Sequence, residues 1–124
     1  MKLVELVNTL DLAVASAEGH LGHEVTGGYA SDLLSDVIAH GQAGSIWITL
    51  QSHVNIVAVA SLKDLVGIVL VNGRQPDADT VQKSETEGIP VLVSKLPMFE
   101  LVGRLYELGI RGGGVGDTPD AMKN

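Results

Sequence analysis

The clearest hydrophobic pattern lies in residues 45–73 and predicts one strand, helix, strand unit. Residues 46–50 are β-branched and aromatic, and residues 66–71 are apolar on both faces, as expected for parallel strands covered by helices on both sides. Residues 55–64, with Ser52 at the expected N-cap, predict a helix that is apolar nearly all round. Such a helix is either sandwiched within the domain or buried in a subunit interface.

The rest of the pattern predicts further helices and strands in alternation. The predicted elements are a helix at 2–10, strands at 12–15 and 25–26, a helix capped by Ser31 and ended by a left-handed Gly41, a helix at 76–87, a strand at 91–93 and a helix from Pro97 to Leu108. The inner face of the helix after Ser31 is predicted to consist of Leu33, Leu34, Val37 and Ile38. Three consecutive parallel strands are expected, because each follows a helical crossover.

This alternation predicts a single three-layer α/β domain with a mixed, mainly parallel sheet over residues 1–110. The chain of 124 residues is long enough for one such domain and its core. Aromatic residues make up only 3% of the chain, so the core is expected to be aliphatic. Residues 111–124 are rich in glycine and lack periodicity, which predicts a flexible tail.

Composition narrows the classes of function. The net charge of −7 argues against binding to nucleic acid or to an anionic membrane surface. The chain has no cysteine, which excludes disulfides, thiolate metal sites and cysteine nucleophiles. Since the pattern shows neither a signal peptide nor a transmembrane run, we expect a cytoplasmic protein.

The unit from Thr49 to Gly73, followed by Pro76, Asp77 and residues 88–91, resembles the DRTGG domain family. Relatives occur in the amino-terminal region of HPr kinase/phosphorylase, within some bacterial phosphotransacetylases and between CBS domains of certain inorganic pyrophosphatases. The resemblance covers roughly residues 2–110 and implies the fold of the HPr kinase amino-terminal domain. It is greatest to small stand-alone members, some of which are encoded near iron-only hydrogenase or related redox genes.

The family's own motif is only partly present. Its Asp-Arg pair falls on Ser52 and His53, and its Thr-Gly-Gly falls on Val71, Asn72 and Gly73, so only the last glycine is kept. The matches around the motif include Thr49 at the end of the strand, Asn55 at the start of the helix, and the turns at Gly44 and Gly73.

Polar residues follow each predicted parallel strand and form the candidate binding site. The predicted ligand-binding residues are Thr49, Gln51, Ser52, His53, Asn55, Asn72, Gly73, Arg74 and Lys95. The carboxyl ends of such strands share one edge of the sheet, where ligands usually bind in open α/β folds. His53 could hydrogen-bond an anionic or nucleotide-like ligand, or could belong to a capping and turn cluster. Arg74 and Lys95 are the cations expected to hold an anion.

Two further clusters leave alternatives open. Gly27 and Gly28 permit either a tight bend or the close approach of another backbone or a ligand phosphate. His20 and His23, with glutamates beside them, could present ligands to a metal or form a solvated turn, and the turn is favoured. We therefore assign no metal site and no cofactor.

These observations favour a non-catalytic regulatory or protein-interaction module. The chain has no phosphate-binding loop of the GxxxxGK[ST] type and no recognisable catalytic constellation. The resemblance implies a homodimer that senses a small ligand or docks to a partner enzyme, with redox or hydrogenase metabolism as its context. The alternative is a nucleotide- or anion-binding small enzyme that uses the edge around His53 and Arg74.

Overall fold

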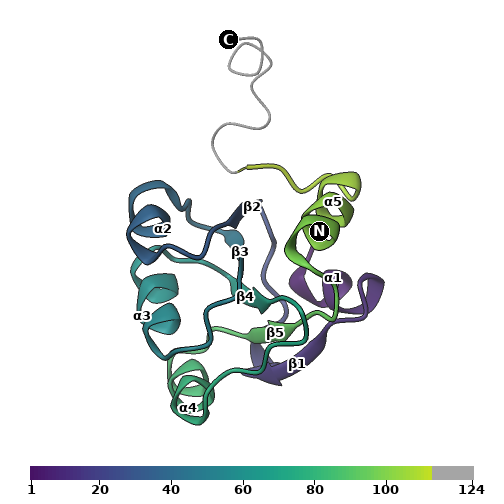
Figure 1. Ribbon diagram of the computed structural model, residues 1–124. Coiled ribbons are helices and arrows are strands. Elements are labelled where there is room, and N and C mark those ends of the chain that lie inside the picture. The colour runs from purple at the N-terminus through teal and green to yellow at the C-terminus, as the bar shows by residue number, and fades with distance from the viewer. Residues whose placement is uncertain (113–124) are drawn as a thin grey trace.

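Five strands form one sheet in the computed structural model, which describes residues 1–112 (Figure 1). The strands are β1 (Ala13–Ser16), β2 (Gly27–Ala30), β3 (Ser45–Thr49), β4 (Gly67–Leu70) and β5 (Val91–Val93), in the spatial order β1-β5-β4-β3-β2. Strands β2 to β5 are parallel, and β1 pairs with β5 in the antiparallel direction. The predicted set of three adjacent parallel strands, and with it the mixed α/β sheet, is confirmed.

The helices divide into two layers, one on each face of the sheet (Figure 1). The helices are α1 (Leu3–Thr9), α2 (Leu34–His40), α3 (Asn55–Leu62), α4 (Ala78–Glu87) and α5 (Met98–Glu107), and a short 3-10 helix, η1, spans Glu18–His20. We call α2, α3 and α4 the three-helix layer, and α1 and α5 the two-helix layer. Every residue of β3, β4 and β5 is buried, because helices cover both faces of these strands.

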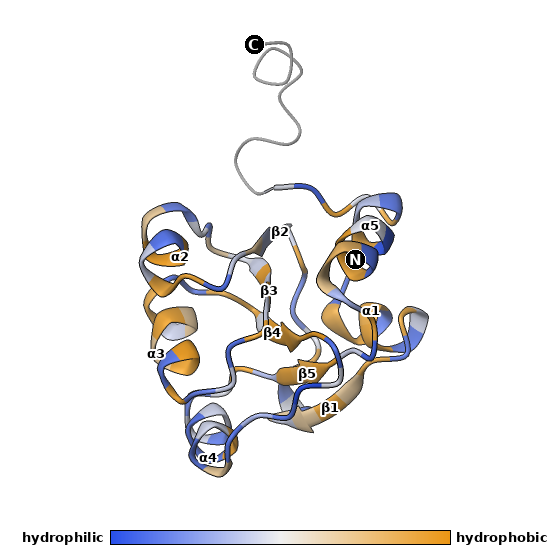
Figure 2. Ribbon diagram, in the orientation of Figure 1, coloured by the Kyte–Doolittle hydropathy of each residue, from blue (hydrophilic) through white to orange (hydrophobic). Residues whose placement is uncertain are grey.

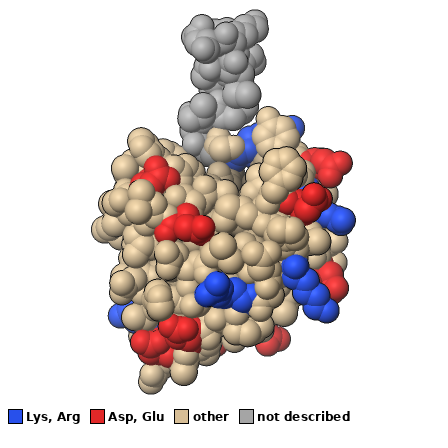
Figure 3. Space-filling view, viewed as in Figure 1, with Lys and Arg blue, Asp and Glu red and all other residues tan. Residues whose placement is uncertain are grey.

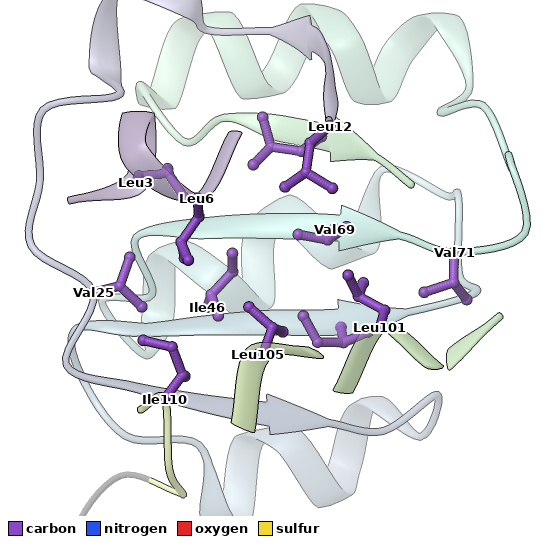
Figure 4. Packing of buried hydrophobic residues seen from close by; sticks show 12 residues of the cluster. Leu3, Leu6, Leu12, Val25, Ile46, Val69, Val71, Leu101, Leu105 and Ile110 are labelled. Carbon is purple, nitrogen blue, oxygen red and sulfur yellow. The ribbon is translucent and has the colours of Figure 1, made fainter. Parts of the chain in front are cut away.

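Each layer has its own aliphatic core against the sheet. Under the two-helix layer, Leu101 and Leu105 of α5 pack near Ile46 and Val69 of the central strands (Figure 4). Under the three-helix layer, Trp47 lies in the core beside residues of α2 and α3. Figure 2 shows the corresponding pattern, with hydrophobic colour on the strands and on parts of the helices that cover them. Alternation along β3 therefore sends successive side chains to opposite cores.

Helix α3 is sandwiched within one chain. Its residues Ile56, Val57, Val59 and Ala60 are buried between the sheet and the neighbouring helices α2 and α4. Only Leu62, among its large apolar residues, is exposed, at 67%. Of the two alternatives for this helix, the structure shows the first, so its apolar composition does not require a second subunit.

Several predicted helix ends are wrong. Ser52 is not the N-cap of α3, since Val54 holds that position and the Ser52 hydroxyl donates to Asp77. Ser31 does not cap α2, because the helix starts three residues later and the Ser31 hydroxyl accepts the Leu33 N–H in a local turn. Gly41 is extended, with φ −62° and ψ 141°, and is not left-handed.

The predicted inner face of α2 is half right. Val37 is buried and Leu34 packs beside it, whereas Leu33 and Ile38 are 64% and 41% exposed. Leu33 precedes the first helical turn in an extended conformation, so it does not share the helical face. Ile38 follows the buried Val37 by one residue, which rotates its side chain about 100° away from the sheet.

The second strand also begins later than predicted. Val25 and Thr26 lie before β2, and the glycine pair predicted to follow the strand forms its first half. Arg111 and Gly112 run alongside β2, with the Gly28 N–H donating to the Arg111 carbonyl at 2.9 Å. These two residues of the predicted tail therefore lie against the sheet, and the rest of it lies outside the described residues.

The helix predicted at 76–87 ends where predicted and begins two residues later, as α4 (Ala78–Glu87). Asp77 holds the N-cap position of α4, and Gly88 ends it with a positive φ of 69°. None of the helices within residues 1–112 has the length and apolar character needed to cross a membrane.

Candidate functional site

The sheet brings most of the predicted binding residues to one edge. Thr49 ends β3 and residues 50–53 follow it, residues 72–74 follow β4 and Lys95 follows β5, and these three strands are parallel neighbours. We call this set the strand-end rim. Asn55, the remaining predicted residue, is exposed at the first position of α3. The rim nevertheless has two parts that differ in charge and in hydrogen bonding.

The β3 part of the rim is bonded to Asp32, in the loop that joins β2 to α2. The buried Thr49 hydroxyl donates to Asp32 Oδ1 at 2.9 Å, and the Leu50 N–H donates to the same oxygen at 2.7 Å. The Gln51 side-chain amide donates to the Asp32 carbonyl at 3.0 Å. Asp32 thus uses the donors of Thr49 and Gln51 that were predicted to meet a ligand. The sequence offered a weak signal, an Asp two residues after the end of β2, the strand that pairs with β3.

A second carboxylate, that of Asp77, lies beside Ser52 and His53. The Ser52 hydroxyl donates to Asp77 Oδ1 at 3.3 Å, and His53 Nδ1 lies 3.1 Å from Asp77 Oδ2. The Ser52 carbonyl accepts the Thr80 hydroxyl at 2.7 Å. The His53 side chain is 70% exposed, so its second ring nitrogen, Nε2, remains available to solvent or a ligand. Asp77 therefore orients His53 and adds negative charge to this part of the rim.

The β4 and β5 part of the rim carries the cations. Asn72 and Gly73 form a turn with positive φ angles of 57° and 67°, which asparagine and glycine tolerate best. Their N–H groups donate to the Leu96 and Ser94 carbonyls at 2.9 and 2.7 Å, so these donors are not free for an anion. Arg74 and Lys95 are exposed, and neither forms an ion pair within residues 1–112.

Charge on the molecular surface is sparse and mixed in sign. Figure 3 shows charged side chains of both signs scattered over a largely neutral face, with some basic side chains directly beside acidic ones. Since the chain carries 15 acidic and 8 basic residues, two unpaired cations on neighbouring strand ends are a local exception to the overall charge. Their guanidinium and ammonium groups are suited to phosphate or carboxylate oxygens.

A small pocket lies between β2, β3 and α5 and was missed by the sequence analysis. Its lining includes Gly28 and Ala30 of β2, Ile48 of β3, and Val102 and Leu105 of α5. A Cβ added at Gly28 would lie 3.2 Å from Ile110 Cγ2, so this glycine makes room for the Ile110 side chain beside the pocket. One predicted alternative for Gly28, the close approach of another backbone, is confirmed, because the Arg111 backbone lies against it.

Arg111 lines this pocket, and its side chain folds back against α5. Its guanidinium stacks on the Tyr106 ring at 3.7 Å from the centroid and donates to the Tyr106 carbonyl. The pocket is thus mainly apolar, with one cation that already has an aromatic partner. No short sequence motif predicts it, because its lining comes from segments far apart in the chain.

Two residues with shifted pKa values, Tyr29 and Asp36, lie on the three-helix side of β2. The Tyr29 hydroxyl donates to Asp36 Oδ2 at 2.7 Å. This hydrogen bond lowers the pKa of Asp36 from its ordinary value and raises the pKa of Tyr29. The pair connects the edge strand to α2.

His20 and His23, which the sequence analysis considered as metal ligands, do not belong to a group of side chains arranged to hold a metal within the described residues. No group of three or more histidine, cysteine, aspartate or glutamate side chains within residues 1–112 is arranged to hold a metal ion. The His20 ring lies over Gly88, where an added Cβ would come within 2.8 Å of His20 Cε1. Gly88 therefore provides the room that this imidazole occupies.

Comparison with solved structures shows which fold this is. The structure is similar to a crystal structure of the CBS and DRTGG domains of the regulatory region of Clostridium perfringens pyrophosphatase, complexed with its activator, diadenosine tetraphosphate. The TM-score is 0.64 at 15% sequence identity, over 94% of this chain and 51% of that chain, so the chain spans about half the length of that structure. No family model and no curated protein matches the sequence.

The fold of this chain is therefore DRTGG-like, as the resemblance implied. At this low identity the likeness shows the fold alone. The closer kinship to the HPr kinase amino-terminal domain stays a prediction, as does the set of ligand-binding residues.

Proposed function

We propose that this domain is a non-catalytic regulatory module that binds a small anionic ligand of the nucleotide class. The DRTGG-like fold supports this proposal, because the similar structure belongs to the regulatory region of a pyrophosphatase bound to a nucleotide activator. The observation that carries it is the pair of exposed cations, Arg74 and Lys95, on neighbouring strand ends. Ligands of open α/β folds usually bind at this edge of the sheet.

The division of the rim assigns different parts of the ligand to different residues. Arg74 and Lys95 hold the phosphate or carboxylate group, since neither has an ion-pair partner within the described part of the chain. Asp32 and Asp77 repel an anion from the β3 part, so His53 Nε2 and the exposed Asn72 side chain contact an uncharged part such as a sugar or base. Thr49, Gln51 and Ser52 position this edge through the two aspartates, and Asn55 lies at its margin.

The test is calorimetric titration of the full chain with AMP, ADP, ATP, diadenosine tetraphosphate and inorganic phosphate. Binding of at least one of these is expected, with a matching rise in melting temperature by mass action. Arg74→Ala and Lys95→Ala should each weaken binding by about tenfold or more, the loss of one charge-assisted hydrogen bond. Lys83→Ala removes an exposed cation of α4 and serves as the matched control. Absence of binding to all five compounds, or unchanged affinity in both rim variants, contradicts the proposal.

The proposed setting of the module is a cytoplasmic homodimer that docks to a partner enzyme. The regulatory character of the similar pyrophosphatase region supports a link to an enzyme. The partner belongs to redox or hydrogenase metabolism in this proposal, on the resemblance to stand-alone family members. Affinity capture from the native host, with and without nucleotide, tests it: recovery of a redox enzyme supports the link, and recovery of none in either condition counts against it.

A second candidate function, a small enzyme that binds nucleotides or anions, rests on the His53–Asp77 pair. A carboxylate 3.1 Å from Nδ1 orients an imidazole so that Nε2 can exchange a proton with a ligand. Arg74 would then hold the anionic group of a substrate. Release of phosphate from nucleotides or acyl phosphates that disappears in His53→Ala supports the enzyme, whereas binding without turnover supports the regulatory module.

A further inference from the structure

The Asp32 carboxylate lies at the β3 part of the strand-end rim with one oxygen bound and the other open. Its Oδ1 accepts both the Thr49 hydroxyl and the Leu50 N–H, so the side chain is held in one orientation at the end of β3. Its Oδ2 accepts no hydrogen bond from any group in residues 1–112, and the Asp32 residue is exposed. Because each oxygen of an ionised carboxylate has two lone pairs, Asp32 offers a fixed, unused acceptor at this edge of the sheet.

The other carboxylate of the rim, that of Asp77, does not offer such an acceptor. Its Oδ1 accepts the Ser52 hydroxyl, and its Oδ2 lies 3.1 Å from His53 Nδ1. Both of its oxygens therefore serve side chains of the rim itself. Of the two aspartates, Asp32 is the one with an oxygen left for a ligand.

The sheet sets the spacing between this oxygen and the two cations. The carboxylate is bonded to Leu50, the first residue after β3, whereas Arg74 follows β4 and Lys95 follows β5. Neighbouring strands lie about 4.8 Å apart, so the carboxylate is anchored at a strand next to that of Arg74 and two strands from that of Lys95. The hydroxyls of a ribose are separated from its 5′-phosphate by a comparable length, that of one sugar ring.

A carboxylate beside an anion-binding edge restricts the chemistry of the ligand. Its charge repels a phosphate, so a ligand that occupies both parts of the rim must place hydrogen-bond donors at Asp32 and its anionic group at Arg74 and Lys95. A ribonucleotide meets both requirements, because its 2′- and 3′-hydroxyls are neutral donors. Dinucleotide-binding α/β folds use an acidic side chain near a strand end for the same contact with ribose.

We propose that the ligand is a ribonucleotide and that Asp32 Oδ2 accepts hydrogen bonds from its 2′- and 3′-hydroxyls. Arg74 and Lys95 hold the phosphate of the same molecule. This inference rests on the proposed function and specifies the class of nucleotide. Asp32 thereby selects ribonucleotides over deoxyribonucleotides, whatever base they carry.

Calorimetric titration of the full chain with ADP and ATP, each compared with its 2′,3′-dideoxy form, tests this selection. The dideoxy forms should bind about tenfold more weakly, because they lose the hydrogen bonds to a charged acceptor while they keep the phosphates. The 2′-deoxy and 3′-deoxy forms should each lose part of this factor. Equal affinity for the ribose and dideoxy forms overturns the inference.

An isosteric variant tests whether Asp32 is the acceptor. Asp32→Asn keeps an oxygen for Thr49 and Leu50 but replaces the open, charged oxygen with an amide nitrogen. The ratio between dideoxy and ribose forms should fall to about threefold or less, while the dideoxy form binds no more weakly than to wild type. Asp36→Asn neutralises a carboxylate of α2 that bonds Tyr29 and should leave the ratio unchanged. A ratio that stays at about tenfold in Asp32→Asn overturns the inference.

A measurement on the wild type does not depend on the folding of any variant. The amide signal of Leu50, whose N–H donates to Asp32 Oδ1, should shift in a two-dimensional NMR spectrum at saturation with ADP, and shift less with dideoxy-ADP. An identical shift with both overturns the contact. Failure of all five compounds in the first titration contradicts the proposed function. Binding of inorganic phosphate or diadenosine tetraphosphate without ADP or ATP leaves that function standing and overturns the ribose contact.

Discussion

The two helix layers bury apolar side chains against the same sheet but differ in how they are held and in what they leave exposed. The three-helix layer combines its core with polar contacts, such as the Trp47 indole N–H to the Ser31 carbonyl at 2.8 Å and the Ser16–Ser84 hydroxyl pair. In the two-helix layer, the buried residues of α1 and α5 are all leucines. In this layer the Phe99 side chain of α5 is 88% exposed.

The difference shows that the apolar content of a helix does not by itself reveal a subunit interface. Helix α3 is apolar nearly all round because it lies in the middle of its layer, between two other helices. Helix α5 has a clear polar and apolar division, yet its outer face carries Phe99 and an open Gly103.

The largest expected effect contrasts the buried centre of α3 with the outer face of α5. Ile56→Ala removes a fully buried side chain and should lower the free energy of unfolding by about 2–5 kcal/mol. Phe99→Ser should change it by less than about 0.5 kcal/mol when measured on the monomer at low concentration. Urea denaturation of both variants makes the comparison. Similar losses in the two would show that Phe99 packs within its own chain.

A second prediction concerns the polar contacts of the three-helix side. Asp32→Ala leaves the buried Thr49 hydroxyl and the Leu50 N–H without their acceptor, which should cost about 1–3 kcal/mol of unfolding free energy. Asp32→Asn keeps an oxygen at the same position and should lose less. Chemical denaturation of the two variants checks the order. Equal stability of Asp32→Ala and wild type would mean that water replaces the carboxylate without loss.

A third, smaller effect compares helix propensity at one exposed position within a helix of each layer. Gly103→Ala should stabilise the monomer by up to about 1 kcal/mol, because alanine favours the helix and meets no neighbour. Ala58→Gly, at an exposed position of α3, should destabilise by a similar amount. Thermal unfolding at low protein concentration measures both. A destabilised Gly103→Ala would indicate that the glycine at this position is needed for packing within the chain.

The smallest expected effect is the pH dependence of the Tyr29–Asp36 contact. The hydrogen bond lowers the pKa of Asp36 in the folded state, so its contribution is present above the unfolded value of about 4 and is lost as the pH falls through the folded pKa. For Tyr29 the pKa is raised, so its contribution is lost only as the pH rises through the folded value, above about 10.

Asp36→Asn should therefore be less stable than wild type at neutral pH, and the gap should close in acid. Urea midpoints at pH values of about 7 and 3 give the comparison. Since this carboxylate is at the surface, a small difference is expected. Its persistence in acid would show that packing, not ionisation, is responsible.

The sequence predicted the central unit well because its signals are local. The strand at 91–93 matches β5, the strands at 46–50 and 66–71 differ from β3 and β4 by one residue at each end, and the helix at 76–87 has the same last residue as α4. Uninterrupted apolar runs and helix-ending residues carry such information within a few positions. The parallel arrangement then followed from connection rules that depend on the order of elements.

The predictions that failed depend on contacts between distant segments. Ser52 appeared to be a helix cap, but its hydroxyl bonds Asp77, which lies 25 residues further along the chain. Asp32 reaches the end of β3 across the sheet, and no pattern near Thr49 indicates it. The pocket beneath α5 likewise exists only once the helix crosses β2. Local sequence cannot place such partners.

The most direct test of the proposed ligand site is a two-dimensional amide NMR titration of the wild type with a nucleotide. The account predicts that the largest shifts fall at the amides of residues 72–74 and 94–96 and vanish in an Arg74→Ala, Lys95→Ala double variant. Shifts confined to α5 and β2, or the same pattern in the double variant, would contradict it.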